Sequence, residues 1–196
     1  MPLLLLDQPI MAREFSNRTE RIRRLYAARG TRHYGEGVSQ IQHAVQTYGI
    51  ARNVGAELEL RIAAFLHDLG HLLVPEKHQE VDMSHELLGA EWLKSRGFCP
   101  LVVDLVQSHV WAKRYLASDP EYYAELSAAS KESLVLQGGV LSDLERRHYE
   151  QLPHFRDALA LRRWDDLAKD ATDLLSHQIP EEIWFDFSLY DKKFPS

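Results

Sequence analysis

The chain has a single cysteine, Cys99, among its 196 residues, and it has no long run of apolar residues. One cysteine excludes a disulfide within the chain and suits a reducing compartment, so we expect a cytoplasmic protein. The short apolar start, Leu3–Leu6, is followed at once by Asp7 and has no basic segment before it. It therefore lacks the features of a signal peptide or a membrane span, and no membrane partner is expected.

Positive charge is also scarce, with 23 Lys and Arg residues against 29 Asp and Glu residues and a net charge of -6. A general nucleic-acid surface needs clustered Lys and Arg, so we expect no nucleic-acid partner. The segment Arg18–Arg32 is locally basic, but its apolar residues fall at helical spacing. This pattern indicates a helix with a solvated basic face rather than a nucleic-acid arm.

Alternating patterns of strand length, internal repeats and Gly-, Ser- or Pro-rich linkers are absent as well. Apolar residues instead recur at helical intervals almost throughout the chain. We expect helices after the N-cap Ser39, over residues 57–69, over 85–96, from Pro100 onward and over 156–175, with a loop that begins at Gly70. The chain therefore predicts one all-α domain, residues 1–196, with a sizeable core.

Four histidines lie on the apolar sides of these predicted helices: His43, His67, His85 and His109. One histidine in such a place is more often a hydrogen-bonded core residue than a ligand. Burying four titratable rings without partners would cost several kcal/mol, and a shared metal centre would supply the partners. Histidine and carboxylate accept iron, manganese or zinc, so the residue types alone leave the metal open.

Two aspartates complete this set of candidate ligands. Asp68 lies about 100° further round the helix than the histidine before it. Its carboxylate has two oxygens, so it is able to bridge two ions while that histidine binds one. Asp165 falls on the apolar face of its predicted helix, whereas Asp166 falls on the charged face with Arg162 and Lys169. We therefore take Asp165 as the candidate ligand and Asp166 as a surface partner of those cations.

Six segments occur in the same order, with compatible spacing, in one known family: Val38–Gln46, Ala63–His71, Ser84–Phe98, Ser108–Leu116, Leu126–Gly139 and Arg162–Lys169. In these segments the chain resembles the HD-domain mixed-valent diiron oxygenases, which cleave the C–P bond of hydroxylated aminoethylphosphonates. A bare His-Asp dipeptide is weak support, but six collinear segments are specific. The resemblance implies a single HD-domain helical bundle, all-α, and a non-haem diiron dioxygenase that acts on organophosphonates.

The resemblance also implies the cofactors, two iron ions in a mixed-valent Fe(II)/Fe(III) state with O2 as co-substrate. The metal ligands carried over are His43, His67, Asp68, His85, His109 and Asp165. Asp68 would bridge the ions and so belongs to the catalytic residues. Asp165 would bind the ion held by the first two histidines, and His85 and His109 would bind the other.

The phosphonate-binding groups of that family match His71, Lys113, Ser130, Ser133 and Gln137. Their chemistry agrees, because cationic, hydroxyl and amide donors are what a phosphonate dianion requires. Lys113 follows a predicted ligand by one helical turn, and the other donors of 130–137 recur at three and four residues. Without the resemblance, a surface lysine and simple turn chemistry would explain Lys113 and Gln137 as well.

One segment departs from the family pattern, in which Tyr-x-x-Glu precedes the first histidine ligand. Glu36 keeps the expected interval to His43, but Tyr34 stands one residue too near and His33 takes its place. By resemblance, the tyrosine caps an iron and the glutamate helps bind the substrate's amino group, so Tyr34 and Glu36 are candidate catalytic residues. Whether the capping residue is Tyr34, His33 or neither stays open. A trimethylammonium prefers aromatic faces, for which Tyr34 is the first candidate.

The predicted reaction is O2-dependent cleavage of a 1-hydroxy-2-aminoethylphosphonate, with a weak preference for the N-trimethyl form, giving glycine betaine and phosphate. The primary amine, giving glycine and phosphate, is the first alternative. An HD-type metal-dependent phosphohydrolase, in which the metals activate water, is the second. His85 and His109 weigh against that hydrolase, and the intact ligand set weighs against a non-catalytic binding module. The sequence does not predict the oligomeric state.

Overall fold

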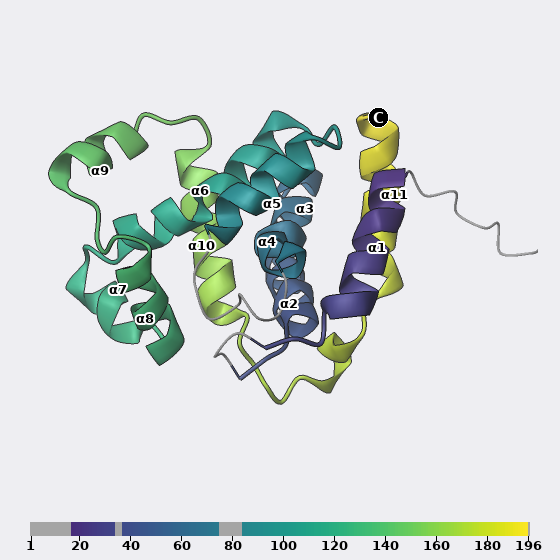
Figure 1. Cartoon of the computed structure of the whole chain (residues 1–196), viewed down its shortest axis with the longest axis horizontal. Coiled ribbons are helices and arrows are strands. Elements are labelled where there is room, and N and C mark those ends of the chain that lie inside the picture. The colour runs from purple at the N-terminus through teal and green to yellow at the C-terminus, as the bar shows by residue number, and fades with distance from the viewer. Residues whose placement is uncertain (1–16, 34–36, 75–83, 196) are drawn as a thin grey trace, which may run out of the picture.

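The computed structural model describes residues 17–33, 37–74 and 84–195, where the regular secondary structure is helical apart from one isolated bridge between His33 and Ser39. The central helices are α2 (Gln40–Asn53), α3 (Leu58–Leu66), α4 (Leu69–Leu73), α5 (His85–Lys94), α6 (Pro100–Leu116) and α10 (Phe155–Leu167). In Figure 1, α1 (Asn17–Arg29) and α11 (Glu181–Lys193) lie along one side, and α7 (Pro120–Glu125), α8 (Ala128–Leu136) and α9 (Asp143–Tyr149) lie on the other. A short 3-10 helix, η2 (Leu174–His177), precedes α11. The all-α prediction is confirmed.

Local signals in the sequence account for several helix ends. Ser39 caps α2, and its side chain and that of Gln42 satisfy each other's backbone N–H groups in a capping box. Gly55 follows the end of α2 with φ of 75°, a conformation that favours glycine. Pro100 occupies the first turn of α6, where a missing N–H costs nothing.

Three expected helices have different bounds. The helix expected over 57–69 ends at Leu66 and a new one begins at Leu69, so Gly70 lies inside α4 and not in a loop. The break occurs because Asp68, with φ of -97° and ψ of 11°, leaves the helical conformation. The helix expected over 85–96 ends at Lys94, and the one expected over 156–175 ends at Leu167.

Helix α6 is the centre of the bundle and packs against α3, α5 and α10. Its predicted inward stripe is buried as expected: Val102, Leu105, Val106 and His109. The residues around it form one apolar core that includes Phe65 and Leu66 of α3. Because α6 is enclosed on three sides, a polar side chain on its inner face must find its partners within the protein.

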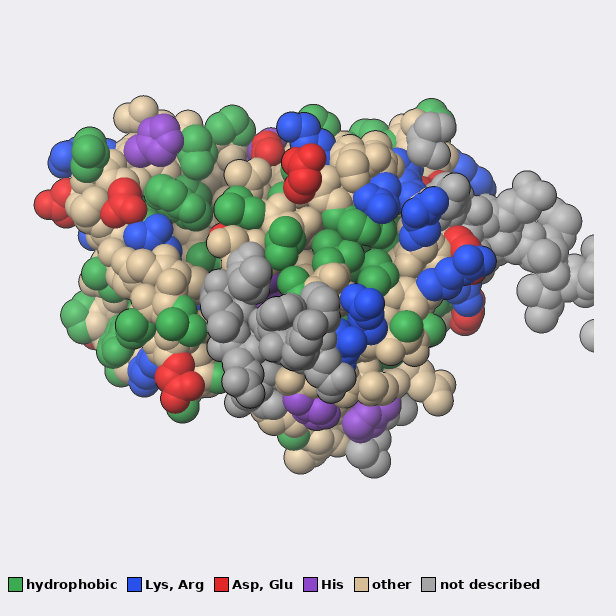
Figure 2. Space-filling view, in the orientation of Figure 1, with side chains coloured by type: hydrophobic (Ala, Val, Ile, Leu, Met, Phe, Trp, Pro, Cys, Tyr) green, Lys and Arg blue, Asp and Glu red, His purple; other side chains and the backbone are tan. Residues whose placement is uncertain are grey.

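The basic helix α1 is partly an internal element, which corrects the expectation of a solvated face. Arg18 is 3% exposed, and its guanidinium donates to Asp191 Oδ1 at 2.7 Å and to the carbonyl oxygen of Gly97 at 2.8 Å. Arg29 donates to the carbonyl oxygen of Leu72 at 2.6 Å. Other basic side chains lie on the surface over α1 (Figure 2). No helix among the described residues has the length and apolarity needed to cross a membrane.

Candidate metal centre

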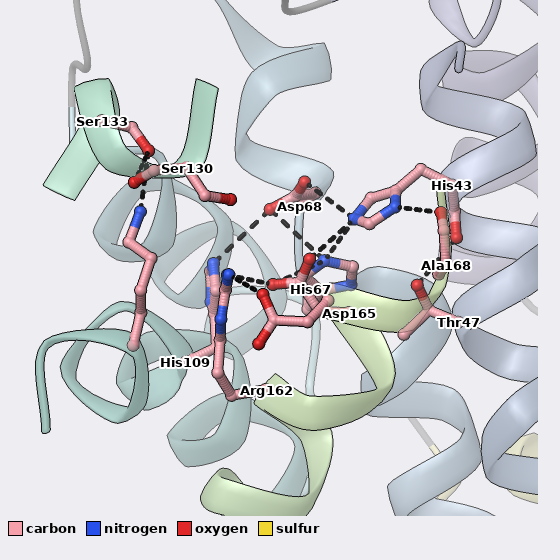
Figure 3. A network of polar contacts seen from close by, with 12 residues as sticks. His43, Thr47, His67, Asp68, His109, Ser130, Ser133, Arg162, Asp165 and Ala168 are labelled. Carbon is pink, nitrogen blue, oxygen red and sulfur yellow. Dashed lines mark hydrogen bonds and ion pairs between the residues drawn. The ribbon is translucent and has the colours of Figure 1, made fainter. Parts of the chain in front are cut away.

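Six polar side chains from separate parts of the chain converge beside α6, and all of them except His85 are labelled in Figure 3. They are His43 of α2, His67 at the end of α3, Asp68 before α4, His85 at the start of α5, His109 of α6 and Asp165 of α10. All are buried except Asp68, whose side chain is 18% exposed. These are the six ligands predicted from the sequence, and the fold brings all of them together.

Asp68 lies between two pairs of facing imidazoles. The Nε2 atoms of His43 and His67 are 3.1 Å apart, and those of His85 and His109 are also 3.1 Å apart. Asp68 Oδ2 is 3.6 Å from His43 Nε2, while its Oδ1 is 3.4 to 3.5 Å from the Nε2 atoms of the other three rings. One carboxylate thus faces both pairs, which is the arrangement that a bridging ligand needs.

The protonation of the rings fits a metal better than a hydrogen-bonded core. In His43, His67 and His109, Nδ1 lies 2.7 to 2.9 Å from the backbone carbonyl oxygens of Ala168, Ala64 and Val106. A carbonyl only accepts, so in a neutral ring Nδ1 carries the proton and Nε2 presents a lone pair. Within the first pair, two lone pairs then face each other. A cation between them removes that repulsion, and backbone carbonyls behind the rings are the usual support for metal-binding histidines.

The surroundings set the charges of these groups. Burial lowers the pKa of His67 to about 4, which keeps the ring in its metal-binding neutral form. Burial also lowers the pKa of His43, but the hydrogen bond and charge of Asp165 outweigh burial, and the net pKa is raised. For Asp68, burial raises the pKa, yet the imidazoles around it, His67 first, hold it well below its ordinary value. The neutral ring of His67 and the ionised carboxylate of Asp68 are both in the form that binds a divalent cation.

Arg162 separates the roles of the two neighbouring aspartates. Its Nη1 donates to Asp165 Oδ2 at 2.5 Å, which leaves Asp165 Oδ1 facing His43 Nε2 at 3.2 Å. Asp166 instead pairs with Nη2 of Arg162 and accepts a hydrogen bond from the Tyr122 hydroxyl at 2.5 Å. Asp165, and not Asp166, thus lies beside the histidines, as the helical periodicity predicts, and its role as a ligand stays a prediction. The same periodicity was wrong about Arg162, which is 4% exposed and not a surface residue.

Three of the predicted phosphonate-binding residues, Lys113, Ser130 and Ser133, lie together where the end of α6 meets α8. The Lys113 ammonium is buried and donates to Ser133 Oγ at 2.8 Å (Figure 3 shows the serines). Ser130 is buried in the preceding turn of α8, and it accepts a hydrogen bond from Lys169 Nζ at 3.0 Å. Lys169 was expected only as a partner of Asp166, because its contact with a serine 39 residues away has no local signal in the sequence.

The other two predicted residues, His71 and Gln137, lie on different elements. The His71 ring stacks on that of His85 with centroids 3.9 Å apart, and a ring nitrogen lies within 4.8 Å of ligand atoms of both His85 and Asp68. This places it beside the second histidine pair, where either a metal or a substrate anion is within reach. Gln137 is the half-buried C-cap of α8.

The altered motif before the first histidine ligand is only partly described. Tyr34 and Glu36, the candidates for capping and for binding the amino group, lie outside the described residues. His33 is exposed and forms the isolated bridge with Ser39, directly before α2. The His33 backbone thus lies next to the N-cap of α2, the helix that carries His43. The role of the His33 side chain stays a prediction.

The chain matches the HD domain family over residues 41–137. It is 41% identical over 146 residues to the hydroxymethylphosphonate dioxygenase of Gimesia maris, a match that covers 71% of this chain and 72% of that relative. It is 37% identical over 161 residues to the glycine-betaine-forming 1-hydroxy-2-(trimethylamino)ethylphosphonate dioxygenase of Leisingera caerulea, covering 79% and 82%. An uncharacterised protein of Acanthamoeba polyphaga mimivirus is 34% identical over 148 residues, covering 71% and 67%.

Proposed function

This chain belongs to the HD-domain family of phosphonate oxygenases, and we propose that it uses O2 to break the C–P bond of a 1-hydroxyalkylphosphonate. The observation that carries the proposal is the position of Asp68, with one oxygen toward His43 and the other toward the remaining three imidazoles. Two histidine pairs around one carboxylate fit a pair of metal ions. The two dioxygenase relatives favour redox-active ions over the water-activating pair of a hydrolase.

Iron is the metal that we propose, because reaction with O2 requires an ion that changes its oxidation state, which zinc and magnesium do not. One ion would be held by His43, His67, Asp68 and Asp165, and the other by Asp68, His85 and His109. When bound, a mixed-valent Fe(II)/Fe(III) pair supplies the electron transfer with O2. The buried, neutral His67 and the ionised Asp68 suit such a pair without a further protein base.

The chain's own part is to hold the phosphonate end of the substrate next to the metals. Lys113 follows His109 by four residues of α6, a rise of about 6 Å, so the two side chains lie on the same face of the helix. Ser133 and Ser130 add hydroxyl donors, and His71 stands beside the second pair. A substrate with its phosphonate on these donors would have its 1-hydroxyl carbon toward the metals. The ammonium would also stabilise the phosphate that leaves.

The reaction balances without an outside reductant. A 1-hydroxyalkylphosphonate and one O2 contain the atoms of a carboxylic acid and phosphate, so the C–P and C–H electrons reduce O2 completely. The trimethylammonio substrate then gives glycine betaine and phosphate, and the primary amine gives glycine and phosphate. This balance is why oxygen uptake and phosphate release must be equal.

For the substrate, we propose 1-hydroxy-2-(trimethylammonio)ethylphosphonate, supported by the Leisingera caerulea relative and by the altered segment at His33, Tyr34 and Glu36. An aromatic ring near a carboxylate suits a quaternary ammonium, which has no N–H to donate. Hydroxymethylphosphonate is a second candidate, supported by the Gimesia maris relative. The primary amine is the third.

The test is to incubate iron-loaded protein with each of these three phosphonates and to measure O2 uptake and phosphate release together. We expect one phosphate per O2 and the highest kcat/KM with the trimethylammonio compound. His109→Ala should abolish both signals, whereas exchange of the exposed His148 for alanine should not. A higher kcat/KM for another compound would replace the substrate, and phosphate release without O2 uptake would replace the oxygenase by a phosphohydrolase.

A further inference from the structure

Two lysine ammonium groups donate hydrogen bonds to neighbouring serine hydroxyls of α8. Lys113 Nζ donates to Ser133 Oγ at 2.8 Å, and Lys169 Nζ donates to Ser130 Oγ at 3.0 Å. The two serines are one turn apart, and Ser133 Oγ in turn donates to the carbonyl oxygen of Ser130 at 3.2 Å. Lys113 belongs to α6, and Lys169 lies in the segment after α10. The fold therefore brings two positive charges from distant segments to one turn of α8.

The end of α10 explains how Lys169 reaches this position. The helix stops at Leu167, and Ala168 leaves the helical conformation with ψ of 47°. The Ala168 carbonyl oxygen lies 2.9 Å from Nδ1 of His43, a candidate metal ligand. The next residue is Lys169, so one short turn of chain supports the metal centre through its backbone and the serine cluster through its side chain. A continued helix would have left Lys169 on the outer, charged face.

Two aspartates and one arginine lie near Lys169, and the arginine pairs with both aspartates. The single positive charge of Arg162 is shared by the two carboxylates of Asp165 and Asp166, with which it forms close ion pairs. The Asp166 carboxylate interacts with the Lys169 charge, and it is itself bonded to Arg162 and Tyr122. Lys169 thus lies between the Ser130 hydroxyl and an acidic group that is already paired with Arg162.

We propose that Lys169 is a further phosphonate-binding residue, the second ammonium of a two-lysine clamp with Lys113; this inference rests on the proposed function. A phosphonate dianion would meet two positive charges and two serine hydroxyls on one turn of α8. Two cations favour a dianion over a monoanion such as a carboxylate or sulfonate of the same shape. The clamp thus selects the phosphonate group, and inorganic phosphate, the product, binds the same donors.

The experiment measures the affinity of the iron-loaded protein for inorganic phosphate by calorimetry without O2. Lys169→Met keeps the length and apolar stem of the side chain and removes its charge, so phosphate binding should weaken about tenfold. Lys169→Arg should stay within about threefold of the wild type, because it keeps the charge. The matched control is Lys131→Met. Lys131 lies on α8, the helix that carries the two serines, but its ammonium donates to the carbonyl oxygen of Ala124. This substitution should leave the affinity unchanged.

Iron content and melting temperature, measured on each variant, separate binding from folding. Loss of phosphate affinity in Lys169→Met with full iron content supports the clamp. If Lys169→Met binds phosphate normally while Lys113→Met does not, Lys169 is excluded from the site and the proposed function stands. Loss of iron together with affinity in Lys169→Met would make the residue structural and overturn the inference. If the wild type does not bind phosphate at all, the clamp is wrong, whereas O2 uptake with phosphate release from the substrate tests the proposed function separately.

Discussion

Gly70 of α4 packs directly against the backbone of His85, the first residue of α5. A Cβ at position 70 would lie 1.9 Å from the carbonyl oxygen of His85, far inside any tolerated contact. Gly89 faces the same crossing, where a Cβ would lie 3.2 Å from the backbone nitrogen of Gly70. The glycine two residues after Asp68 is thus needed for close approach of two helices, and that approach carries His85 to the metal centre.

Gly70→Ala should therefore displace His85 and remove one metal ion while the other stays. We expect the iron content to fall from two ions per chain to about one, with helical content retained. The measurement is metal analysis together with circular dichroism. Gly49→Ala is the control, since a Cβ there would meet nothing within 4 Å and α2 would gain a better helix former. Two ions per chain in Gly70→Ala would contradict this prediction. They would mean that His85 is not a ligand, or that α4 and α5 move apart without displacing it.

Asp68→Ala should disturb both ions, because the Asp68 carboxylate faces both histidine pairs. His109→Ala should mainly remove one, because His109 belongs to the second pair. Metal analysis and the EPR signal of the mixed-valent state would distinguish these outcomes. An Asp68→Ala protein that keeps one full-occupancy ion would contradict the bridging role.

Asp165→Ala and Asp166→Ala should differ sharply although the residues are adjacent. Asp165 faces His43, so its loss should weaken the binding of the first ion and leave Arg162 with one carboxylate partner fewer. Asp166→Ala should keep both ions and lower the melting temperature, because Arg162 and the Tyr122 hydroxyl lose a buried acceptor. The comparison is the iron content of the two variants. Normal iron content in Asp165→Ala, with loss in Asp166→Ala, would reverse the assignment.

Metal-free protein should lose stability as the pH falls below about 6.5, in part through His67. The folded pKa of His67 is about 4, below its ordinary value of 6.5, so between these values the unfolded chain binds a proton that the folded chain does not. From pH 6.5 to pH 5 this linkage costs about 2 kcal/mol. Urea unfolding of wild type and His67→Gln at pH 7 and pH 5 measures it, and the drop should be smaller in the variant. An equal drop in both would assign the loss to other groups.

Helical periodicity was enough to predict the class of fold and the helix ends at Ser39, Gly55 and Pro100, because capping and backbone conformation are local properties of a few residues. The same periodicity put the candidate ligands on inward faces. It failed where long-range contacts decide the conformation. Gly70 signals a loop locally, yet it lies in a helix because that helix must pass close to His85.

The sequence by itself determined the ligand types and, through the resemblance of its ordered segments, the family to which the chain belongs. Only the tertiary structure decided that Arg162 is buried between two aspartates, that α10 ends at Leu167, and that Lys169 meets Ser130. The physical reason is distance along the chain. Periodicity reports which side of a helix is apolar, whereas the contacts of Lys113 and Lys169 with the serines of α8 depend on how distant segments pack.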